Sequence, residues 1–214
     1  MSTLRTITGF KERLAGGGAR PNLFEVALPS FPGPITDFWK TAKGEEADTF
    51  NFLCKAAALP ASNVNFIPVP FRGRIMKVAG DRTFDPWRVT IINDEDFQLR
   101  TAFELWMNSI SRLDTATGFT SPNAYMTDAY VYQLGRGAET RKFSERESGA
   151  VDGSRIPPLK TYKFYDIFPT NVSEIALSYE SADQVEQFDV EFQVQWWSAG
   201  EGQDNGDQTE TIIK

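Results

Sequence analysis

Residues 185–197 constrain the fold more than any other stretch, because apolar and polar side chains alternate there without a break. The apolar positions are Phe188, Val190, Phe192, Val194 and Trp196, and the polar positions between them are Asp189, Glu191, Gln193 and Gln195. Successive side chains of a strand point to opposite faces, so this spacing predicts a long strand with one packed side and one acidic-polar side. Such a strand requires a sheet with one face covered.

Residues 77–113 predict what covers that face. Residues 87–91 (Trp-Arg-Val-Thr-Ile) alternate as a half-buried strand, and the acidic cluster 93–96 then begins a helix. Asn93 or Asp94 can cap the free N–H groups of its first turn. At helical spacing one apolar stripe collects Leu99, Ala102, Phe103, Trp106, Ile110 and Leu113. We expect this helix, the only long one in the chain, to lie against the sheet.

Further strands are predicted at 23–28, 49–55, 129–134, 159–168 and 175–179, with a turn at 169–171. The count of about seven strands and one helix predicts a mainly β fold with one flanking α-helix, as a β-barrel or sandwich. Residues 56–70 contain three prolines and little periodicity, so we expect a long loop. Residues 136–158 are polar and favour a mobile hairpin or insertion. Residues 198–214 favour a flexible polar tail.

Composition removes several classes of chemistry. The 214 residues contain no histidine and one cysteine, Cys54, which excludes histidine-activated nucleophiles and multi-cysteine zinc sites. Cys54 lies on the apolar side of the predicted strand 49–55, where we expect a buried small hydrophobe rather than a reactive thiol. The net charge of −7 argues against a general nucleic-acid binder but fits a surface past which nucleic acid slides. Apolar runs are too short to span a bilayer, and residues 1–20 hold no signal-peptide core, so we expect cytoplasmic assembly.

The remaining routes to catalysis are weak. Three glycines at 16–18 could cradle a phosphate, but no Gly-Lys-Ser/Thr follows them, so we expect a hinge. Two carboxylate pairs could act as acid and base: Glu145 with Glu147, and Asp94 with Asp96. The first lies in a polar loop and the second at a helix start, which are simpler explanations. We therefore expect no enzyme, no cofactor and no metal.

Four segments carry a family resemblance. They are 19–26 (Ala-Arg-Pro-Asn-Leu-Phe-Glu-Val), 54–60 (Cys-Lys-Ala-Ala-Ala-Leu-Pro), 78–87 (Val-Ala-Gly-Asp-Arg-Thr-Phe-Asp-Pro-Trp) with 93–95, and 168–172 (Phe-Pro-Thr-Asn-Val) with the strand 188–197. None is a general-purpose motif. With them the chain resembles the tail tube proteins of T4-like contractile-tailed bacteriophages. The departures are 136–158 and 198–214, so we expect one tail-tube domain over 1–197.

The resemblance implies a structural virion subunit. Six copies would form a ring whose strands join in one continuous barrel, and rings would stack into a tube assembled in the host cytoplasm. The implied partners are further copies of the chain, the sheath, tape-measure, baseplate and tail-terminator proteins, and genomic DNA that passes through without specific binding. No membrane is implied. The alternatives are a baseplate tube-initiator protein of the same fold and, outside the family, a monomeric binding module.

Three surfaces become candidates for contact. The row Asp189, Glu191, Gln193 and Gln195 would face the lumen, where its negative sign would repel phosphates; the alternative is a solvated sheet face. Val64, Phe66 and Ile67 in the predicted loop 56–70 would contact the adjacent ring or subunit, and the alternative is a simple surface loop. Phe97 and Leu105, off the helix stripe, would meet a neighbouring subunit or the sheath, and the alternative is scattered surface groups.

Overall fold

The computed structural model describes residues 7, 9, 10, 14, 18–29, 31–32, 53–135, 158–180 and 184–201. The chain divides into two compact units, one made of 1–25, 131–162 and 199–214 and the other of 26–130 and 163–198. The glycines at 16 and 17, the pair Glu145 and Glu147, and nearly all of the predicted insertion and tail lie outside the described residues. No helix within the described part is long and apolar enough to cross a membrane.

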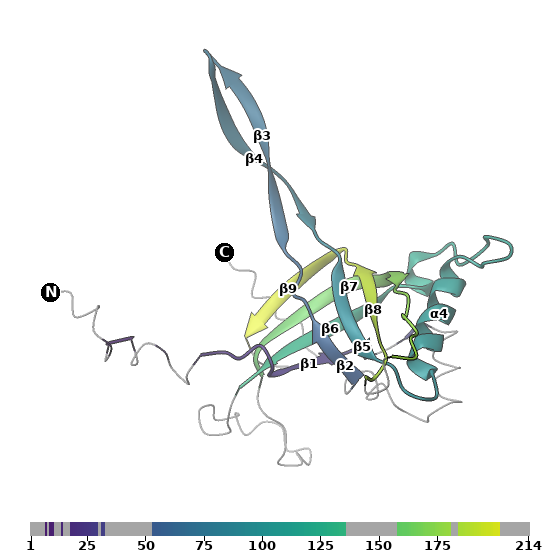
Figure 1. Ribbon diagram of the computed structural model, residues 1–214. Coiled ribbons are helices and arrows are strands. Elements are labelled where there is room, and N and C mark those ends of the chain that lie inside the picture. Colours follow the sequence, from purple (N-terminus) through teal and green to yellow (C-terminus); the bar gives the residue numbers. More distant parts are fainter. Residues whose placement is uncertain are drawn as a thin grey trace, which may run out of the picture. The chain divides into compact units, whose positions relative to one another are not determined.

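Most described elements are strands. They are β1 (Phe24–Ala27), β2 (Cys54–Ala57), β3 (Ser62–Phe71), β4 (Arg74–Phe84), β5 (Trp87–Ile92), β6 (Thr127–Leu134), β7 (Pro158–Val172), β8 (Gln187–Gln193) and β9 (Trp196–Glu201). The helix α4 spans Gln98–Ile110, and a 3-10 turn, η2, spans Pro122–Ala124. A seven-stranded sheet runs in the order β1-β6-β7-β8-β5-β2 with β9 also paired to β7, and β3 and β4 form a separate two-stranded sheet (Figure 1). Over the described residues, the predicted mainly β class with a helix beside the sheet is confirmed, and the strands form open sheets.

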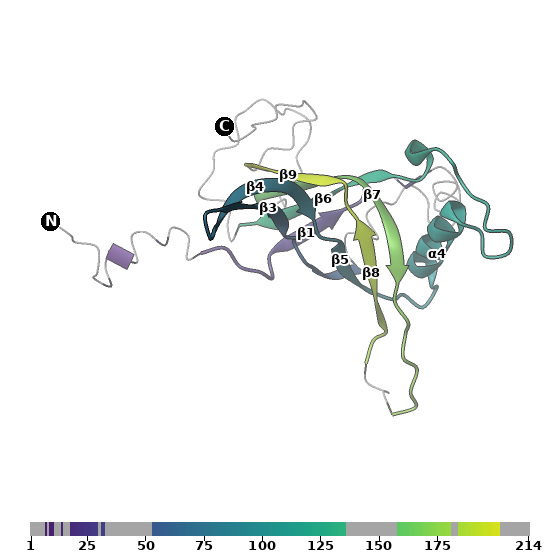
Figure 2. The same cartoon turned by 90° about the horizontal axis from the view of Figure 1, so that it is seen from above.

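The core lies between α4 and one face of the β5–β8 pair. Burial alternates along both strands, as the sequence predicts, and Trp87 and Phe192 are cross-strand neighbours. Phe103 of α4 packs edge-on against Phe192, with ring centroids 5.9 Å apart, and Trp106 lies 6.0 Å from the same ring. Full burial of such a side chain contributes about 1.5–3 kcal/mol, so these rings hold the helix on the sheet (Figure 2).

The helix begins later and ends earlier than predicted. The N-cap residue is Phe97, not the predicted Asn93 or Asp94, and it makes no side-chain cap hydrogen bond. The Asp94 carboxylate still accepts a hydrogen bond from the Gln98 amide at 3.2 Å, whereas Asn93 is buried and its side-chain amide donates to Glu186. Helix α4 stops at Ile110, and Leu113 is 97% exposed. Its inclusion in the buried stripe was therefore wrong, because the backbone becomes extended at Ser111, with φ −150° and ψ 109°, and turns the chain off the helical path.

The predicted loop 56–70 is largely strand. Residues 54–57 form β2, which pairs with β5, and 62–71 form β3, which pairs with β4. Prolines are tolerated in β3 because a two-stranded ribbon leaves one backbone edge of each strand free of ladder hydrogen bonds.

The C-terminal strands also differ from expectation. Strand β7 continues through the predicted turn 169–171, which is instead a register shift in its pairing with β8. Residues 175–179 are not strand. The long strand predicted at 185–197 divides into β8 and β9, and β9 carries residues 198–201, which were expected in the flexible tail. The break lies opposite Asp166 of β7, whose φ of 51° interrupts the extended ladder.

Candidate functional site

The polar side of β8 carries three of the four predicted lumen residues. Asp189 is exposed, and Glu191 and Gln193 are half-buried, while the residues between them are buried. Gln195 is exposed but lies in the break between β8 and β9, so it does not continue the row on β8. The Asp189 carboxylate accepts a 2.6 Å hydrogen bond from the Thr90 hydroxyl. The structure thus brings Asp189, Glu191 and Gln193 onto one strand face and separates Gln195 from them.

The predicted row has basic neighbours on the strands β5 and β2. Arg88 lies across from Glu191 in the register and forms a 3.0 Å ion pair with it. Lys55 of β2 donates a 2.7 Å hydrogen bond to Gln187. Arg88 of β5 therefore balances Glu191, and the Lys55 ammonium of β2 lies on the same surface against Gln187. The sequence pattern of β8 alone could not predict these neighbours, because strand pairing brings residues that are distant in sequence next to β8.

The β3–β4 hairpin has two exposed faces. Cross-strand partners share a face, and every second residue along a strand joins it. The apolar face, as we name it, therefore comprises Ile67, Val69, Phe71, Met76 and Val78, with Arg74 at its tip. The opposite face, which we name the cationic face, comprises Val64, Phe66, Pro68, Pro70, Ile75, Lys77 and Arg82. The predicted contact residues thus divide, with Ile67 on the apolar face and Val64 and Phe66 on the cationic face.

The hairpin exposes a large amount of apolar surface. Its large apolar residues are between 38% exposed at Val69 and 67% exposed at Ile75. On the cationic face, the Lys77 ammonium lies 4.8 Å from the Phe66 ring centroid, so the Lys77 side chain covers part of that ring. In Figure 1 the hairpin extends away from β5 and β8 of the same unit. A contiguous exposed apolar face of this kind marks an interaction surface.

The turn of the hairpin is a tight two-residue connection. Arg72 and Gly73 both have positive φ, 45° and 81°, between the paired Phe71 and Arg74. This is the backbone geometry that two-residue hairpins favour, and an X-Gly dipeptide between apolar runs is its sequence signal. That signal was present in the sequence and could have revealed the hairpin despite its prolines.

The predicted helix-surface pair is only partly exposed. Phe97, at φ 53° just before α4, is 45% exposed, and its carbonyl accepts hydrogen bonds from the Thr101 amide and hydroxyl. Leu105 is half-buried on the helix. The two residues remain a predicted contact.

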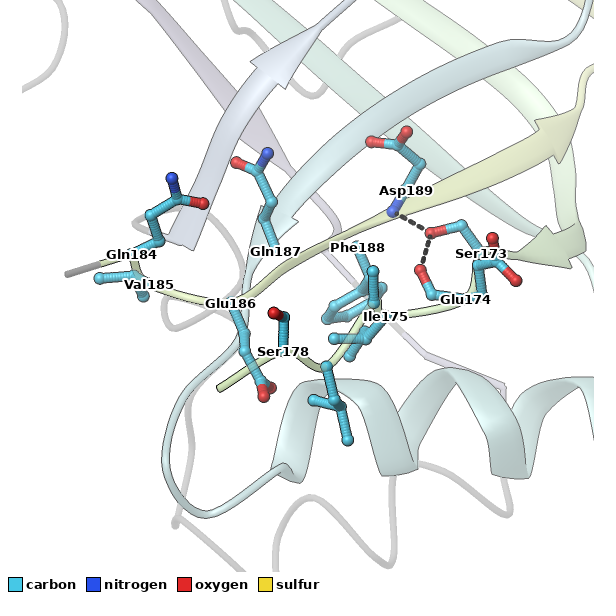
Figure 3. A pocket seen from close by; sticks show the side chains of 12 residues that line it. Ser173, Glu174, Ile175, Ser178, Gln184, Val185, Glu186, Gln187, Phe188 and Asp189 are labelled. Carbon is cyan, nitrogen blue, oxygen red and sulfur yellow. Dashed lines mark hydrogen bonds between the residues drawn. The ribbon is translucent and has the colours of Figure 1, made fainter. Parts of the chain in front are cut away.

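A pocket lies where the chain leaves β7 and returns to β8, a feature that the sequence did not indicate. It has a volume of about 420 Å³ and is lined by residues 173–178 and 184–189. Figure 3 shows Glu174, Ile175 and Phe188 along its wall. The Arg100 guanidinium reaches it from α4, donates to the Ser173 carbonyl at 3.0 Å, and pairs with Glu104.

A cation and aromatic rings gather on the β6–β7 surface. Lys163 forms a 3.1 Å ion pair with Asp128 and lies 4.4 Å from the Tyr165 ring centroid, and Tyr165 stacks on Trp196 at 3.7 Å. Partial burial alone would lower the pKa of Lys163, but the hydrogen bond and charge of Asp128 raise it above its usual value. Lys163 is therefore charged at neutral pH and joins β6 to β7.

Cys54 is buried at the start of β2. Burial raises the pKa of its thiol from 9.0 to about 12, against a smaller lowering by a backbone hydrogen bond with Ala56. The expectation of a buried hydrophobe fits this environment. Within the described residues, no group of three or more His, Cys, Asp and Glu side chains could hold a metal ion.

Cys54 should therefore label slowly while the protein is folded. At pH 8 the shift lowers the thiolate fraction by roughly a thousandfold, so we expect iodoacetamide to modify native protein at least about a hundredfold more slowly than urea-unfolded protein. The raised pKa also predicts that stability falls as the pH rises from 9 towards 12, because the unfolded state releases the proton first. Equal labelling rates in the two states would contradict this environment.

Comparisons of sequence and of structure relate the chain to tail tube proteins and to chains of contractile particles. The family model described as phage tail tube protein matches residues 19–199. The chain is 33% identical over 183 residues to the tail tube proteins gp19 of Enterobacteria phages T4 and T6, covering 86% of this chain and 93% of each relative. A chain in the cryo-EM structure of the anti-feeding prophage baseplate shares the fold, with a TM-score of 0.55, 10% identity, and coverage of 86% of this chain and 96% of that one. The chain belongs to the phage tail tube protein family.

Proposed function

We propose that the chain is the structural subunit of the inner tube of a contractile phage tail. Near full-length homology to tail tube proteins of phages T4 and T6 carries this proposal. The family is a structural one, and we propose no catalytic role and no cofactor. The subunit would reside in the virion after assembly in the host cytoplasm. The predicted single tail-tube domain over 1–197 stays part of this proposal.

Six copies would close a ring by joining their sheets into one barrel. Among the described strands, β1 and β2 end the sheet order, and each is only four residues long. Unpaired backbone groups at a sheet edge invite pairing with another chain, and closure of a ring removes such edges. This supports the hexameric ring that the family resemblance implies.

The polar face of β8 would line the channel. The ion pair of Arg88 with Glu191 and the hydrogen bond of Lys55 to Gln187 leave no row of unpartnered cations on the described part of this face to hold phosphates. DNA could then pass without specific binding. Pairing, rather than net negative charge, is the feature that supports this role.

Reversing both acids of this face should impede DNA. In Asp189→Lys with Glu191→Lys, Arg88 loses its counter-charge and two cations are added to the face, so we expect DNA release from particles to slow at least about tenfold at low salt and to recover as salt screens these cations. The neutral pair Asp189→Asn with Glu191→Gln is the matched control and should release DNA close to the wild-type rate. Release from the lysine variant at the wild-type rate would exclude this face from the lumen.

Stacked rings would contact one another and their partners through the remaining surfaces. The hairpin with Val64, Phe66 and Ile67 would join adjacent rings, and Phe97 and Leu105 would meet a neighbouring subunit or the surrounding sheath. The baseplate would nucleate the tube, the terminator would cap it, and the tape-measure protein would occupy its channel before DNA.

Sedimentation velocity of the purified chain tests the proposal. We expect species much larger than a 24.0 kDa monomer, growing with concentration or on added baseplates. A chain that stays monomeric under both conditions would contradict the tube role. Many copies per particle, measured by quantitative mass spectrometry, would distinguish a main tube subunit from the baseplate initiator, to which the homology gives no additional support.

A further inference from the structure

The hairpin is unusual in its charge as well as its apolar surface. Residues 49–80 contain no Asp or Glu but include Arg72, Arg74 and Lys77 at or near the tip. Arg74 lies at the tip end of the apolar face, across from Phe71. Its guanidinium has no ion-pair or hydrogen-bond partner among the described residues. The tip therefore offers one unopposed cation beside an exposed apolar face.

The pocket between 173–178 and 184–189 has the complementary character. Residues 164–213 contain eleven Asp and Glu and no Lys or Arg. Glu174 is exposed, and its carboxylate has no partner within the described part of the chain. Leu177 and Val185 at the same pocket are 80% and 72% exposed. The nearby Arg100 guanidinium is paired with Glu104, so the carboxylate of Glu174 remains available beside exposed apolar side chains, as the Arg74 guanidinium does on the hairpin.

The two surfaces lie at opposite ends of the same strands. The hairpin joins β5 at Trp87, which pairs with Phe192, whereas the pocket adjoins the other end of β5, where Ile92 pairs with Gln187. Six strand residues separate these ends by about 17–20 Å, and the hairpin extends away from β5 and β8 (Figure 1). A subunit therefore does not fill its own pocket.

The outer edge of β3 is poorly suited to pairing with another strand. Pro68 and Pro70 have no N–H, and their nitrogens belong to the edge of β3 that faces away from β4, because the inner edge needs donors. Side-chain contacts are therefore favoured on the β3 side of the hairpin. The apolar face offers five exposed apolar side chains with an arginine at the tip.

We propose that the apolar face of the hairpin in one copy docks into the pocket lined by 173–178 and 184–189 in the next copy, with Arg74 against Glu174. Met76 and Val69 would cover Leu177 and Val185. Charge complementarity identifies a second copy of this chain as the occupant. Because donor and acceptor are different surfaces at opposite ends of the subunit, the contact is head-to-tail and repeats without closing, which generates a linear stack. This inference rests on the stacking in the proposed function and names its acceptor site.

A charge-swap cycle tests the pairing. We expect Arg74→Glu and Glu174→Arg each to reduce the stacked fraction at least about tenfold, and the double variant to recover to within about threefold of wild type. Arg112→Glu and Asp114→Arg, which make the same charge changes in the exposed loop after α4, should stack as the wild type does. All four positions are exposed, so melting temperatures should match. Singles that behave like the controls, or a double variant no better than the singles, would overturn the pairing.

Intermolecular cross-linking gives a second, independent readout. Cys54 is buried, so the native chain supplies a low background. A mixture of Met76→Cys and Leu177→Cys proteins should form a disulfide-linked dimer on mild oxidation, whereas either variant alone should form few. If the wild-type protein forms tubes but the mixture of the two cysteine variants forms no cross-link, only the pocket assignment is refuted. Wild-type protein that never stacks would instead contradict the proposed function.

Discussion

Replacing Trp106 with alanine is expected to destabilise the subunit by about 3–5 kcal/mol, the largest single effect on stability that we predict. Trp106 is fully buried on α4 and contacts the rings of Phe31, Phe103 and Phe192, with centroids 6.0–6.3 Å apart. Its indole N–H also donates a 2.7 Å hydrogen bond to the Tyr125 carbonyl. The substitution removes the rings' common neighbour and leaves that carbonyl without this donor.

Two control variants separate these contributions. Trp106→Phe keeps an aromatic ring and loses the hydrogen bond, so it should cost less than the alanine change. Leu113→Ala removes an exposed apolar side chain from the same helical spacing and should change stability by less than about 0.5 kcal/mol. Urea unfolding followed by far-UV circular dichroism measures the free energy of unfolding of all three variants. A similar loss in Leu113→Ala and Trp106→Ala would mean that the helix packs differently.

The largest effect on assembly is expected from the apolar face of the hairpin. In Ile67→Ser with Val78→Ser, a cross-strand pair on that face becomes polar. Neither residue is buried within the subunit, so the melting temperature should shift by only a few degrees, since exposed substitutions cost about 0.5 kcal/mol or less. Tube formation, in contrast, should fall by roughly a hundredfold or more, because each ring interface would repeat the loss around its circumference.

The matched control is Leu113→Ser with Phe119→Ser, which makes two exposed apolar side chains polar outside the hairpin. It should form tubes like the wild type. Quantitative pelleting of assembled tubes, with circular dichroism of the same samples, measures both properties. If the hairpin variant formed tubes at the control's level, the apolar face would have no part in stacking.

The elements predicted correctly from sequence are those whose burial is local and one-sided. The alternation in β8 and β5 and the stripe Leu99, Ala102, Phe103 and Trp106 each face one core, so their periodicity carries the information. Leu113 has the same spacing but no core beside it. Periodicity predicts the face of a helix and not its end.

The hairpin escaped prediction for the opposite reason. Both of its faces carry apolar residues, so β3 shows no alternation, and its prolines suggested a loop. Apolar and polar residues alternate when one face of a strand is buried and the other is exposed. Both faces of the hairpin are exposed in the single subunit, so no such alternation arises. The charge balance on the β8 face was missed similarly, because Arg88 and Lys55 reach it through strand pairing.

The break between β8 and β9 was not visible in the sequence. Nothing in residues 185–197 indicates it, and the neighbouring strand β7 has an irregularity of its own, the positive φ of Asp166. The pocket lined by 173–178 and 184–189 was also missed, because residues 175–179 have a strand-like composition but are not strand. Such features follow from tertiary arrangement and not from local propensity.

Negative-stain electron microscopy of the purified full-length chain at high concentration tests the central claim most directly. If the chain is a tail tube subunit, six-fold rings or long hollow tubes should form, with added baseplates increasing their number. A chain that remains a dispersed monomer in every field, with and without baseplates, would contradict the account.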